Sequence, residues 1–548
     1  MNHLYYGDNL TVLREHIGDE SVDLIYLDPP FNSNASYNVL FKGGDGAQSA
    51  AQIEAFDDTW HWNDSAEAAF GEVMRGGNAA ASTMLRAMRS FLGDNDMMAY
   101  LAMMAVRLVE LHRVLKPTGS LYLHCDPTAS HYLKVLLDAV FGKDSFRNEI
   151  VWKRTSAHSS ANKFAPVHDI IFFVSRTENY TWNKAFQPIP QVTIDAWYNN
   201  IEPGTGRRFN RADITAAGKR TGSSGLPWRG IDPSKKNRHW AIPGFLGLGK
   251  MSAQDALDLL DQQGRLYWPK KDGGMPMFKR YLEESPGIPA LDVFSDIQPL
   301  NNVAKERLGY PTQKPVALLE RIINASSNPG DTVLDPFCGC GTTVHAAEKL
   351  GRAWIGIDVT HLAIGLIEKR LRDAFPDVRF TTHGVPQDID GARDLAARGK
   401  YHEFEKWALS LIAAQPGNLS RKGADRGIDG NLWFGAKSEG RAIVSVKAGD
   451  NVGVGMVRDL RGVIEREGAG IGVLLTLAEP TKPMTAEAAG AGQCEIAGFA
   501  PVPRIQIVTI ADAMRLRDRA VRLPARRDDA FRRAAREDRG GAQGSLDL

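Results

Sequence analysis

The residues best suited to chemistry stand near the N-terminus, in the run Asp28-Pro29-Pro30-Phe31. They follow residues 22–27, an apolar stretch with the length and composition of a buried strand. Proline fixes φ and cannot continue a strand, so the two prolines predict a rigid turn at the strand's end. A carboxylate, a fixed backbone carbonyl and an aromatic ring would then lie together, and this trio suits a flat base that carries an exocyclic amine. The alternative, which this motif alone leaves open, is an acidic turn after a core strand.

A second motif, far along the chain, joins a short apolar strand to a glycine-rich turn. Residues 332–334 lead into Asp335-Pro336-Phe337-Cys338-Gly339-Cys340-Gly341-Thr342-Thr343, and a helix and a strand that ends at Asp358 follow. Glycines let a backbone approach a ligand closely, and an acidic residue about 20 positions on can hold ribose hydroxyls. Because this turn begins with a carboxylate and lacks the third glycine of dinucleotide-binding motifs, it disfavours phosphate and suits the cationic amino-acid end of S-adenosylmethionine.

Both motifs need elements that bring strand ends together, because ligands collect outside the carboxyl ends of parallel strands. Strand and helix patterns do alternate along the chain, with strands at 3–8, 22–27 and 120–125 and helices at 9–16, 97–115, 132–141 and 316–326. This alternation predicts an α/β fold with a parallel sheet. Residues 32–95 lack a regular pattern, which predicts a functional loop or lid beside the first motif.

Length and composition narrow the class of protein. A chain of 548 residues is too long for one ordinary core and predicts two or three domains. Hydrophobic residues make up 43% and charged residues 24%, as in soluble globular proteins, and no apolar run is long enough for a membrane span. Four scattered cysteines predict neither a disulfide framework nor a zinc site and indicate a reduced, cytoplasmic compartment. The net charge of +1 neither demands nor excludes a polyanionic partner.

From about residue 151, aromatic and basic residues interleave. Cations can neutralise phosphates, and planar side chains can stack on bases. The candidates for contact with DNA are Arg154, Arg229, Lys235, Lys236 and Arg238. A solvated surface domain is the alternative when this segment is taken by itself.

Together the motifs resemble those of the beta-group amino-group DNA methyltransferases, which have a permuted motif order. In that family an Asp-Pro-Pro-Phe/Tyr catalytic motif comes first, a target-recognition region follows, and a Lys-Pro helix and an Asp-Pro-Phe-x-Gly-x-Gly cofactor motif come last. This chain has the same order at residues 28–31, 310–315 and 335–341, and the resemblance covers about residues 1–380. It implies a Rossmann-like, S-adenosylmethionine-dependent methyltransferase sheet with circularly permuted motif order. The implied parts are a catalytic half, an inserted target-recognition and DNA-binding region and a cofactor-binding half, at residues 1–150, 151–305 and 306–385.

The resemblance also implies roles for single residues. Asp28 and the Pro29 carbonyl, held by Pro30, would accept the two N–H bonds of the target amine, and Phe31 would stack on the flipped base. The cofactor would be bound by Lys314, Asp335, Phe337, Gly339, Gly341, Thr342 and Asp358. In this family an Asp at the first motif position goes mostly with adenine N6 and a Ser more often with cytosine N4. We therefore expect methylation of adenine N6 in double-stranded DNA within a restriction-modification or phage-defence system, with cytosine N4 as the alternative.

A separate unit begins near residue 400. Its order of helix, strands and helix resembles Mrr-type restriction endonuclease domains, a branch of the PD-(D/E)xK fold, and implies a smaller α/β domain at 400–512 before a polar, Arg-rich tail at 513–548. The matching residues would be Glu405 and Asp429, which would hold Mg²⁺, and Lys447, which would orient the attacking water. Ser445 stands where that family has Glu or Gln, and a Ser is a poor ligand for a hard cation. The alternative is a module that only contacts DNA or forms a dimer.

Three hypotheses compete. The first is a DNA adenine methyltransferase with an appended nuclease-like domain, and the second is a restriction enzyme whose C-terminal domain cleaves DNA with Mg²⁺ while methylation protects the host. The third is methylation of a protein amide, against which Asp28 argues, since such sites typically begin with Asn. Double-stranded DNA is the expected partner. A homodimer and restriction or defence-system subunits are further partners left open, and no membrane is expected. All DNA hypotheses require Asp28 and Asp335 at one edge of one sheet.

Overall fold

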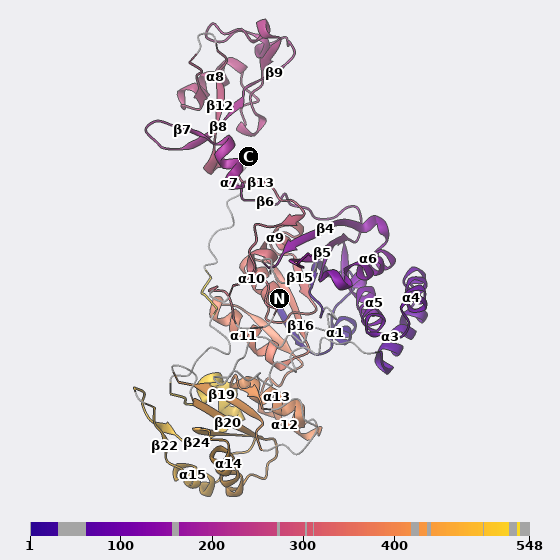
Figure 1. Cartoon of the computed structure of the whole chain (residues 1–548), viewed down its shortest axis with the longest axis vertical. Coiled ribbons are helices and arrows are strands. Elements are labelled where there is room, and N and C mark those ends of the chain that lie inside the picture. Colours follow the sequence, from indigo (N-terminus) through magenta and orange to yellow (C-terminus); the bar gives the residue numbers. More distant parts are fainter. Residues whose placement is uncertain are drawn as a thin grey trace. The chain divides into compact units, whose positions relative to one another are not determined.

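A computed structural model describes residues 2–30, 62–155, 164–270, 274–301, 304–308, 310, 312–399, 401–417, 427–435, 440–496, 498–524 and 534–537. Phe31 is the one predicted site residue outside this part of the chain. The chain divides into two compact units, of which the second is the inserted segment Lys184–Leu291. Figure 1 shows both units, with many of their elements labelled.

The first unit contains a nine-stranded mixed sheet. In order across the sheet, its strands are β14 (Val293–Phe294), β4 (Phe146–Lys153), β5 (His168–Ser175), β3 (Leu115–Cys125), β2 (Val22–Leu27), β15 (Thr332–Asp335), β16 (Ala353–Asp358), β1 (Asn2–Tyr6) and β17 (Phe380–His383). All neighbours from β3 to β17 are parallel, whereas β5 runs antiparallel to β3 and to β4. The α/β class predicted from the sequence is confirmed, and the predicted parallel arrangement holds from β3 to β17 but not at β5.

The strands that carry the two motifs are direct neighbours. β2 and β15 pair in parallel, with Leu24 opposite Val333 and Ile25 opposite Leu334. Since Asp28 follows β2 directly and Asp335 ends β15, both carboxylates lie at the same edge of the sheet. At the opposite edge, the Asp23 carboxylate accepts hydrogen bonds from the Thr332 N–H (2.9 Å) and from Lys116 Nζ (2.7 Å). The expectation that Asp28 and Asp335 lie at one edge of one sheet is confirmed.

Helices cover both faces of this sheet. Residues of β2 alternate between the faces, because side chains along a strand point to opposite sides. Ile25 and Leu27 pack with one set of helices, and Leu24 and Tyr26 with the other. The first set includes α1 (Asn9–His16), α5 (Asp96–Val114) and α6 (Pro127–Phe141), followed by the 3₁₀ turn η1 (Lys143–Ser145), and the second is α9 (Val316–Ser326), α10 (Thr342–Lys349) and α11 (His361–Ala374).

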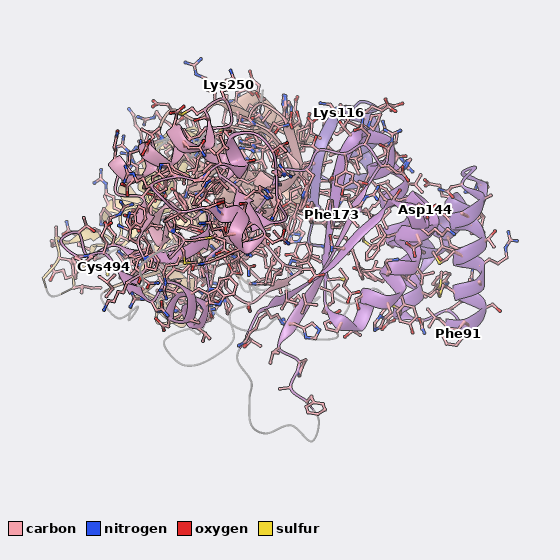
Figure 2. All side chains as sticks on the ribbon, turned by 90° about the horizontal axis from the view of Figure 1, so that it is seen from above. Phe91, Lys116, Asp144, Phe173, Lys250 and Cys494 are labelled. Carbon is pink, nitrogen blue, oxygen red and sulfur yellow. The ribbon has the colours of Figure 1, made fainter. Side chains whose placement is uncertain are left out.

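The prediction of an irregular segment at residues 32–95 is wrong for its second half. Two helices form there, α3 (Asp64–Arg75) and α4 (Ala79–Leu92), and the side chains of Asn63 and Asn78 cap their first turns. The glycine pair at 76–77 is the turn between the two helices, not the sign of a long loop. Phe91, on α4, is 77% exposed (Figure 2). Residues 31–61 of the predicted lid lie outside the described part of the chain.

The compact inserted unit is shorter than the predicted target-recognition region of 151–305. β5, β14 and the end of β4 fall inside that range but belong to the nine-stranded sheet. Their side chains Trp152, Ile171 and Phe294 are buried in its core. The boundary of the insert therefore moves to Lys184 on one side and Leu291 on the other.

The second unit has a core of its own, in which Trp228, Trp240, Leu257 and Phe278 are buried. It contains a four-stranded sheet in the order β11-β12-β8-β7, a two-stranded ribbon of β9 and β10, and a pair formed by its first and last strands, β6 and β13. Its elements are β6 (Phe186–Gln187), α7 (Gln191–Trp197), β7 (Asn200–Ile201), β8 (Arg208–Asp213), β9 (Thr215–Ala217), η2 (Ser223–Gly225), η3 (Pro233–Lys236), β10 (Arg238–Trp240), η4 (Gly244–Leu246), α8 (Ala253–Gln262), β11 (Leu266–Tyr267), β12 (Met277–Tyr281), η5 (Leu282–Glu284) and β13 (Ile288–Pro289).

The C-terminal domain is a smaller α/β structure around a five-stranded sheet in the order β18-β19-β20-β21-β24. The predicted boundary at 512/513 falls inside α16, whose Ala513 is buried in this domain's core, so the Arg-rich tail begins later than predicted.

Among the described residues, no helix is both long and apolar enough to cross a membrane. The domain's elements are α12 (Ile389–Ala397), α13 (Tyr401–Leu411), β18 (Gln415–Pro416), β19 (Gly430–Phe434), β20 (Gly440–Lys447), α14 (Val454–Arg466), β21 (Ile471–Thr476), α15 (Lys482–Ala489), β22 (Gln493–Cys494), β23 (Val502–Pro503), β24 (Ile505–Thr509), α16 (Ile510–Leu516) and η6 (Arg517–Ala520).

Candidate active site

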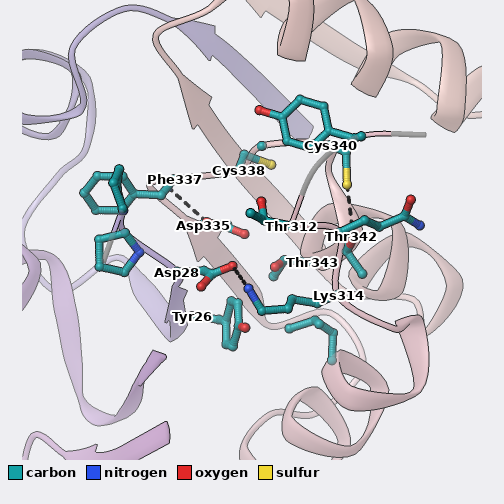
Figure 3. A pocket seen from close by; sticks show the side chains of 16 residues that line it. Tyr26, Asp28, Thr312, Lys314, Asp335, Phe337, Cys338, Cys340, Thr342 and Thr343 are labelled. Carbon is teal, nitrogen blue, oxygen red and sulfur yellow. Dashed lines mark hydrogen bonds and ion pairs between the residues drawn. The ribbon is translucent and has the colours of Figure 1, made fainter. Parts of the chain in front are cut away.

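The turns after β2 and β15 line one pocket, shown in Figure 3. A third wall comes from the segment directly before α9, which contributes Thr312, Gln313 and Lys314. The structure therefore gathers most of the predicted site residues that it describes, namely Asp28, Pro29, Pro30, Lys314, Asp335, Phe337, Gly339 and Thr342. Gly341 and Asp358 do not line the pocket directly but support its glycine-rich turn.

The glycine-rich turn needs glycine at two positions because its backbone is left-handed there. Gly339 has φ +51° and Gly341 has φ +75°. A Cβ on Gly341 would lie 2.8 Å from Ile367 Cγ1, inside van der Waals contact, so α11 packs too closely for any side chain. The turn is closed by a hydrogen bond from the Gly341 N–H to the Cys338 carbonyl at 2.8 Å. The result is an open backbone cradle at the N-terminus of α10.

Two acidic side chains hold this turn in place by accepting hydrogen bonds from its backbone N–H groups. Asp335 Oδ1 accepts a hydrogen bond from the Phe337 N–H at 3.0 Å. Asp358 Oδ2 accepts one from the Gly339 N–H at 2.9 Å, while its Oδ1 accepts from the Thr360 N–H and hydroxyl, both at 2.9 Å. Asp358 thereby ties the turn to the start of α11, and the second lone pair of its Oδ2 can still accept a hydroxyl.

The carboxylates around the pocket favour the binding of a cation. Burial raises the pKa of Asp335 to about 7, against the opposing effect of hydrogen bonds from Thr343 and the Phe337 N–H, and the nearby Asp28 and Asp358 raise it further. Burial also raises the pKa of Asp358 to about 6. Carboxylates crowded in this way are stabilised by a bound positive charge.

The sequence matches the family described as DNA methylase over residues 22–369, which include every one of these pocket residues. The chain belongs to the DNA methylase family. Over residues 396–504 it also matches the family described as restriction endonuclease. The methyltransferase is thus a DNA-modifying enzyme that carries a restriction-endonuclease-type domain at its C-terminal side.

Curated relatives of the methyltransferase are DNA-modifying enzymes. The Type II methyltransferase M.EcaI of Enterobacter cloacae is 31% identical over 422 residues, which cover 75% of this chain and 80% of the relative. The Mod subunit of the Type III restriction-modification enzyme StyLTI of Salmonella typhimurium is 27% identical over 357 residues, covering 63% of this chain and 49% of that subunit. Among solved structures, the cytosine-N4-specific PvuII DNA methyltransferase aligns at 13% identity and a TM-score of 0.31, covering 69% of this chain and 89% of that one.

The methyltransferase uses S-adenosylmethionine, and the pocket fits this cofactor. The carboxylates of Asp335 and Asp358 suit its cationic groups and its ribose hydroxyls, respectively. Gly339 and Gly341 have no side chains, so they leave the backbone of the turn open where the cofactor would lie. One further acceptor is ready for a ligand, because Asp28 Oδ1 is buried and receives no hydrogen bond within the described part of the chain.

Several residues that support the pocket escaped sequence reasoning. Asn9 Nδ2 donates to the Pro336 carbonyl at 2.8 Å, and Asn9 Oδ1 accepts from Arg107 Nε at 2.7 Å, so α1 and α5 brace the second turn. Tyr26 lines the pocket, and its hydroxyl is 2.7 Å from His124 Nδ1 in the sheet's core. Thr343 was signalled only by its place beside Thr342. The sequence pattern held no signal for Asn9, since its contact depends on how α1 packs.

The predicted nuclease residues do not form a complete metal site. Asp429 is 8% exposed, and its Oδ2 accepts hydrogen bonds from Ser445 Oγ (3.1 Å) and from the Val446 N–H (2.5 Å). The side chain of Val444, on β20, packs on the face of the sheet that α13 covers, and α13 carries Glu405. Side chains along a strand alternate between the two faces, so Ser445 and Lys447 point to the opposite face. Among the described residues, no three His, Cys, Asp or Glu side chains converge where a metal ion could bind. The described residues of this domain thus do not supply a full Mg²⁺ set.

The predicted DNA-contact residues fall into two groups. Three of the five are already engaged in ion pairs: Arg154 with Asp169 (3.1 Å), Arg229 with Asp258 (3.0 Å) and Arg238 with Asp213 (2.9 Å). Lys235 and Lys236 are exposed on η3 and have no ion-pair partner within the described residues.

Proposed function

We propose that this methyltransferase transfers a methyl group to N6 of adenine in double-stranded DNA, and that the pocket between β2 and β15 is where it does so. The observation that carries the proposal is the pairing of these two strands, which places Asp28 beside the glycine-rich turn. A base held at Asp28 would then face a cofactor held at Asp335 and Asp358.

The chain's own groups account for the chemistry by position and charge. S-adenosylmethionine supplies an electrophilic methyl group. The lone pair of an exocyclic amine is delocalised into the ring, so the amine is a weak nucleophile. Asp28 Oδ1 and the Pro29 carbonyl would accept its two N–H bonds, favour a tetrahedral nitrogen and turn the lone pair toward the methyl group. Asp28 Oδ1 is also the base in contact with the nitrogen when it must lose a proton after transfer.

Capture of the base would require it to leave the duplex. Extrusion of a base costs a few kcal/mol, which stacking and contacts to the base edge offset. We assign the stacking to Phe31, which follows Pro30 directly in the sequence. Replacement of Phe31 by Ala is expected to weaken base capture and to spare cofactor binding.

Adenine is preferred to cytosine because the motif begins with Asp28, as in adenine-specific members of the resembled family. The DNA adenine methyltransferase YhdJ of Escherichia coli, 25% identical over 370 residues that cover 67% of this chain and 82% of the relative, supports this choice. Its name describes that relative alone. The identity of the methylated base in this chain's product decides between adenine N6 and cytosine N4.

The test is mass spectrometry of nucleosides from DNA methylated by the purified protein. We expect N6-methyladenine from the wild type, none from Asp28→Ala, and an unchanged affinity of Asp28→Ala for S-adenosylmethionine. Asp28→Ser is the matched control, because it keeps a small polar acceptor without the charge. N4-methylcytosine in the wild-type product would overturn the choice of base, and retained methylation in Asp28→Ala would overturn the assignment of the site.

A second candidate activity is Mg²⁺-dependent cleavage of DNA by the C-terminal domain, favoured by the restriction-endonuclease match at residues 396–504. The engagement of Asp429 with Ser445 argues against it. Cleavage that requires Mg²⁺ and disappears in both Asp429→Ala and Lys447→Ala would support a working nuclease. With either outcome we propose that the chain serves a restriction-modification system, as the names of its relatives suggest for those proteins.

A further inference from the structure

The ion pair between Lys314 and Asp28 is the feature of the pocket that methyl transfer alone does not explain. Lys314 Nζ contacts Asp28 Oδ2 (Figure 3), and the two side chains are only 11% and 18% exposed. The other carboxylate oxygen, Oδ1, is buried without a hydrogen-bond partner in the described part of the chain. One oxygen of the proposed catalytic carboxylate is thus occupied by the protein and the other is open.

Lys314 also supplies positive charge to a pocket that is also lined by carboxylates. The pocket wall contains Asp28 and Asp335, with Asp358 just behind, and Lys314 is the one cationic side chain among the described residues that line it. Tyr26 and Tyr310 also face this space. Burial, with a smaller effect of nearby carboxylates, holds the pKa of both phenols well above the ordinary value, so neither supplies a charge. A carboxylate left here without a cation would be costly, because burial disfavours an unpaired charge.

The backbone that carries Lys314 is held in place rather than free to swing. Gln313 accepts a hydrogen bond from the Leu308 N–H at 2.8 Å and donates one to the Glu306 carbonyl at 2.7 Å. On the other side, Pro315 precedes α9, whose first N–H, from Val316, donates to Glu306 Oε2 at 3.1 Å. Thr312 has φ +62°, a left-handed conformation that a β-branched residue rarely adopts, so packing must hold this segment in shape.

We propose that Lys314 is a positioning residue for Asp28: it holds Oδ2 and so presents Oδ1 to the amine of the target base. This inference rests on the proposed function of Asp28. It moves Lys314 from the cofactor side of the pocket, where the family resemblance had put it, to the base side. A carboxylate rotated away from this position would no longer present Oδ1 to the amine.

The first test separates the two sides of the pocket. In Lys314→Met, which keeps length and removes charge, the single-turnover rate of methyl transfer at saturating cofactor is expected to fall about 100-fold or more. Calorimetry should find the dissociation constant for S-adenosylmethionine within about threefold of wild type, because the lost contact belongs to Asp28. In Lys314→Arg, which keeps a cation, most of the rate should remain. Weakened cofactor binding with a wild-type rate at saturation would instead make Lys314 a cofactor contact and overturn the proposal.

A second test does not depend on the stability of one variant. Lys314→Ala leaves room where the side chain lay, so propylammonium added to the assay should restore part of the lost rate, whereas 1-propanol, of similar size without charge, should not. Equal effects of the two additives, or none, would show that the charge beside Asp28 does not matter and would overturn the proposal. Wild-type transfer to adenine is measured in parallel. If the wild type methylates no adenine, it is the proposed function that fails, whatever the Lys314 variants do.

Discussion

At the scale of single residues, the pocket is defined by carboxylates that hold protons near neutral pH. With the pKa of Asp335 near 7 and that of Asp358 near 6, both groups are ionised at pH 8 and largely protonated at pH 5.5. A cationic cofactor binds the ionised forms, so binding should release protons across this range. The sign follows directly: affinity is highest above pH 7 and falls as the pH is lowered through the two pKa values.

We therefore expect the dissociation constant for S-adenosylmethionine to rise by up to about tenfold per pH unit for each proton released below pH 7. Calorimetry at several pH values, in buffers with different ionisation enthalpies, measures both the constant and the proton count. Asp335→Asn removes the group with the higher pKa and should flatten the upper part of the profile. An affinity that is constant from pH 5.5 to pH 8 would show that binding does not require Asp335 and Asp358 in their ionised forms.

At the scale of elements, two glycines allow the steric cost of a side chain in the glycine-rich turn to be separated from the cost of a left-handed backbone. Gly341 and Gly351 share a left-handed φ, of +75° and +71°, but only at Gly341 would a Cβ meet other atoms, at 2.8 Å from Ile367. Gly351→Ala should therefore cost only the backbone strain, about 1–2 kcal/mol. Gly341→Ala should add overpacking of about 1–3 kcal/mol and displace the turn from α11.

The measurements are chemical unfolding and cofactor binding. Gly341→Ala should lose cofactor affinity by a larger factor than its loss of stability alone explains, whereas Gly351→Ala should bind like the wild type. If Gly341→Ala and Gly351→Ala lost the same free energy of unfolding and bound the cofactor equally well, the close packing of the glycine-rich turn on α11 would not determine the shape of the cofactor site.

A second element, the β9–β10 ribbon, has exposed cations at one end that can meet phosphate. Lys235 and Lys236 precede β10, and the exposed Lys219 and Arg220 follow β9, so all four lie at one end of the ribbon. Lys235→Ala with Lys236→Ala should weaken binding to all DNA sequences alike and reduce the salt-dependence slope of log K by about 1 per lysine. Arg238→Ala is the matched control on the same ribbon, because Asp213 already neutralises that guanidinium. A slope that changes as much in the control would point away from the lysines.

The elements also show where sequence reasoning succeeded. The motif turns were predictable because their residues have local causes: prolines that end β2, glycines that need left-handed backbone, and strands that are apolar on both faces. The helices α3 and α4 were missed because residues 32–95 showed no regular pattern and contain a pair of glycines at 76–77. Asn63 and Asn78 cap the two helices, and buried residues on α3 and α4 pack against α5.

At the scale of the whole molecule, the order of the motifs predicted that two distant strands meet, and β2 does pair with β15. The borders of the insert were not predictable in the same way. Aromatic and basic residues begin near Trp152, but Trp152 is part of the sheet's core. Side-chain chemistry marks a change of surface, whereas the border of a domain is set by which strands find partners. That information is non-local, and the composition of a segment does not contain it.

The inserted unit, Lys184–Leu291, provides the last prediction. Its first and last strands, β6 and β13, pair with each other, and the Ala290 N–H donates to the Ala185 carbonyl at 2.9 Å, so the segment closes on itself. Its buried tryptophans and leucines form a core without residues from the rest of the chain. Produced alone, residues 184–291 should therefore unfold cooperatively and give a dispersed NMR spectrum, and Trp240→Ala should abolish both, since truncation of a buried Trp costs about 3–5 kcal/mol.

The complementary variant replaces residues 186–289 by a short Gly-Ser linker. Because the two ends of the segment lie side by side, the nine-stranded sheet should form without it. We expect S-adenosylmethionine binding close to that of the full chain, together with loss of sequence-specific methylation. If the linker variant lost cofactor binding while remaining folded, the insert would be part of the cofactor site. Retained sequence-specific methylation would place recognition of the target elsewhere in the chain.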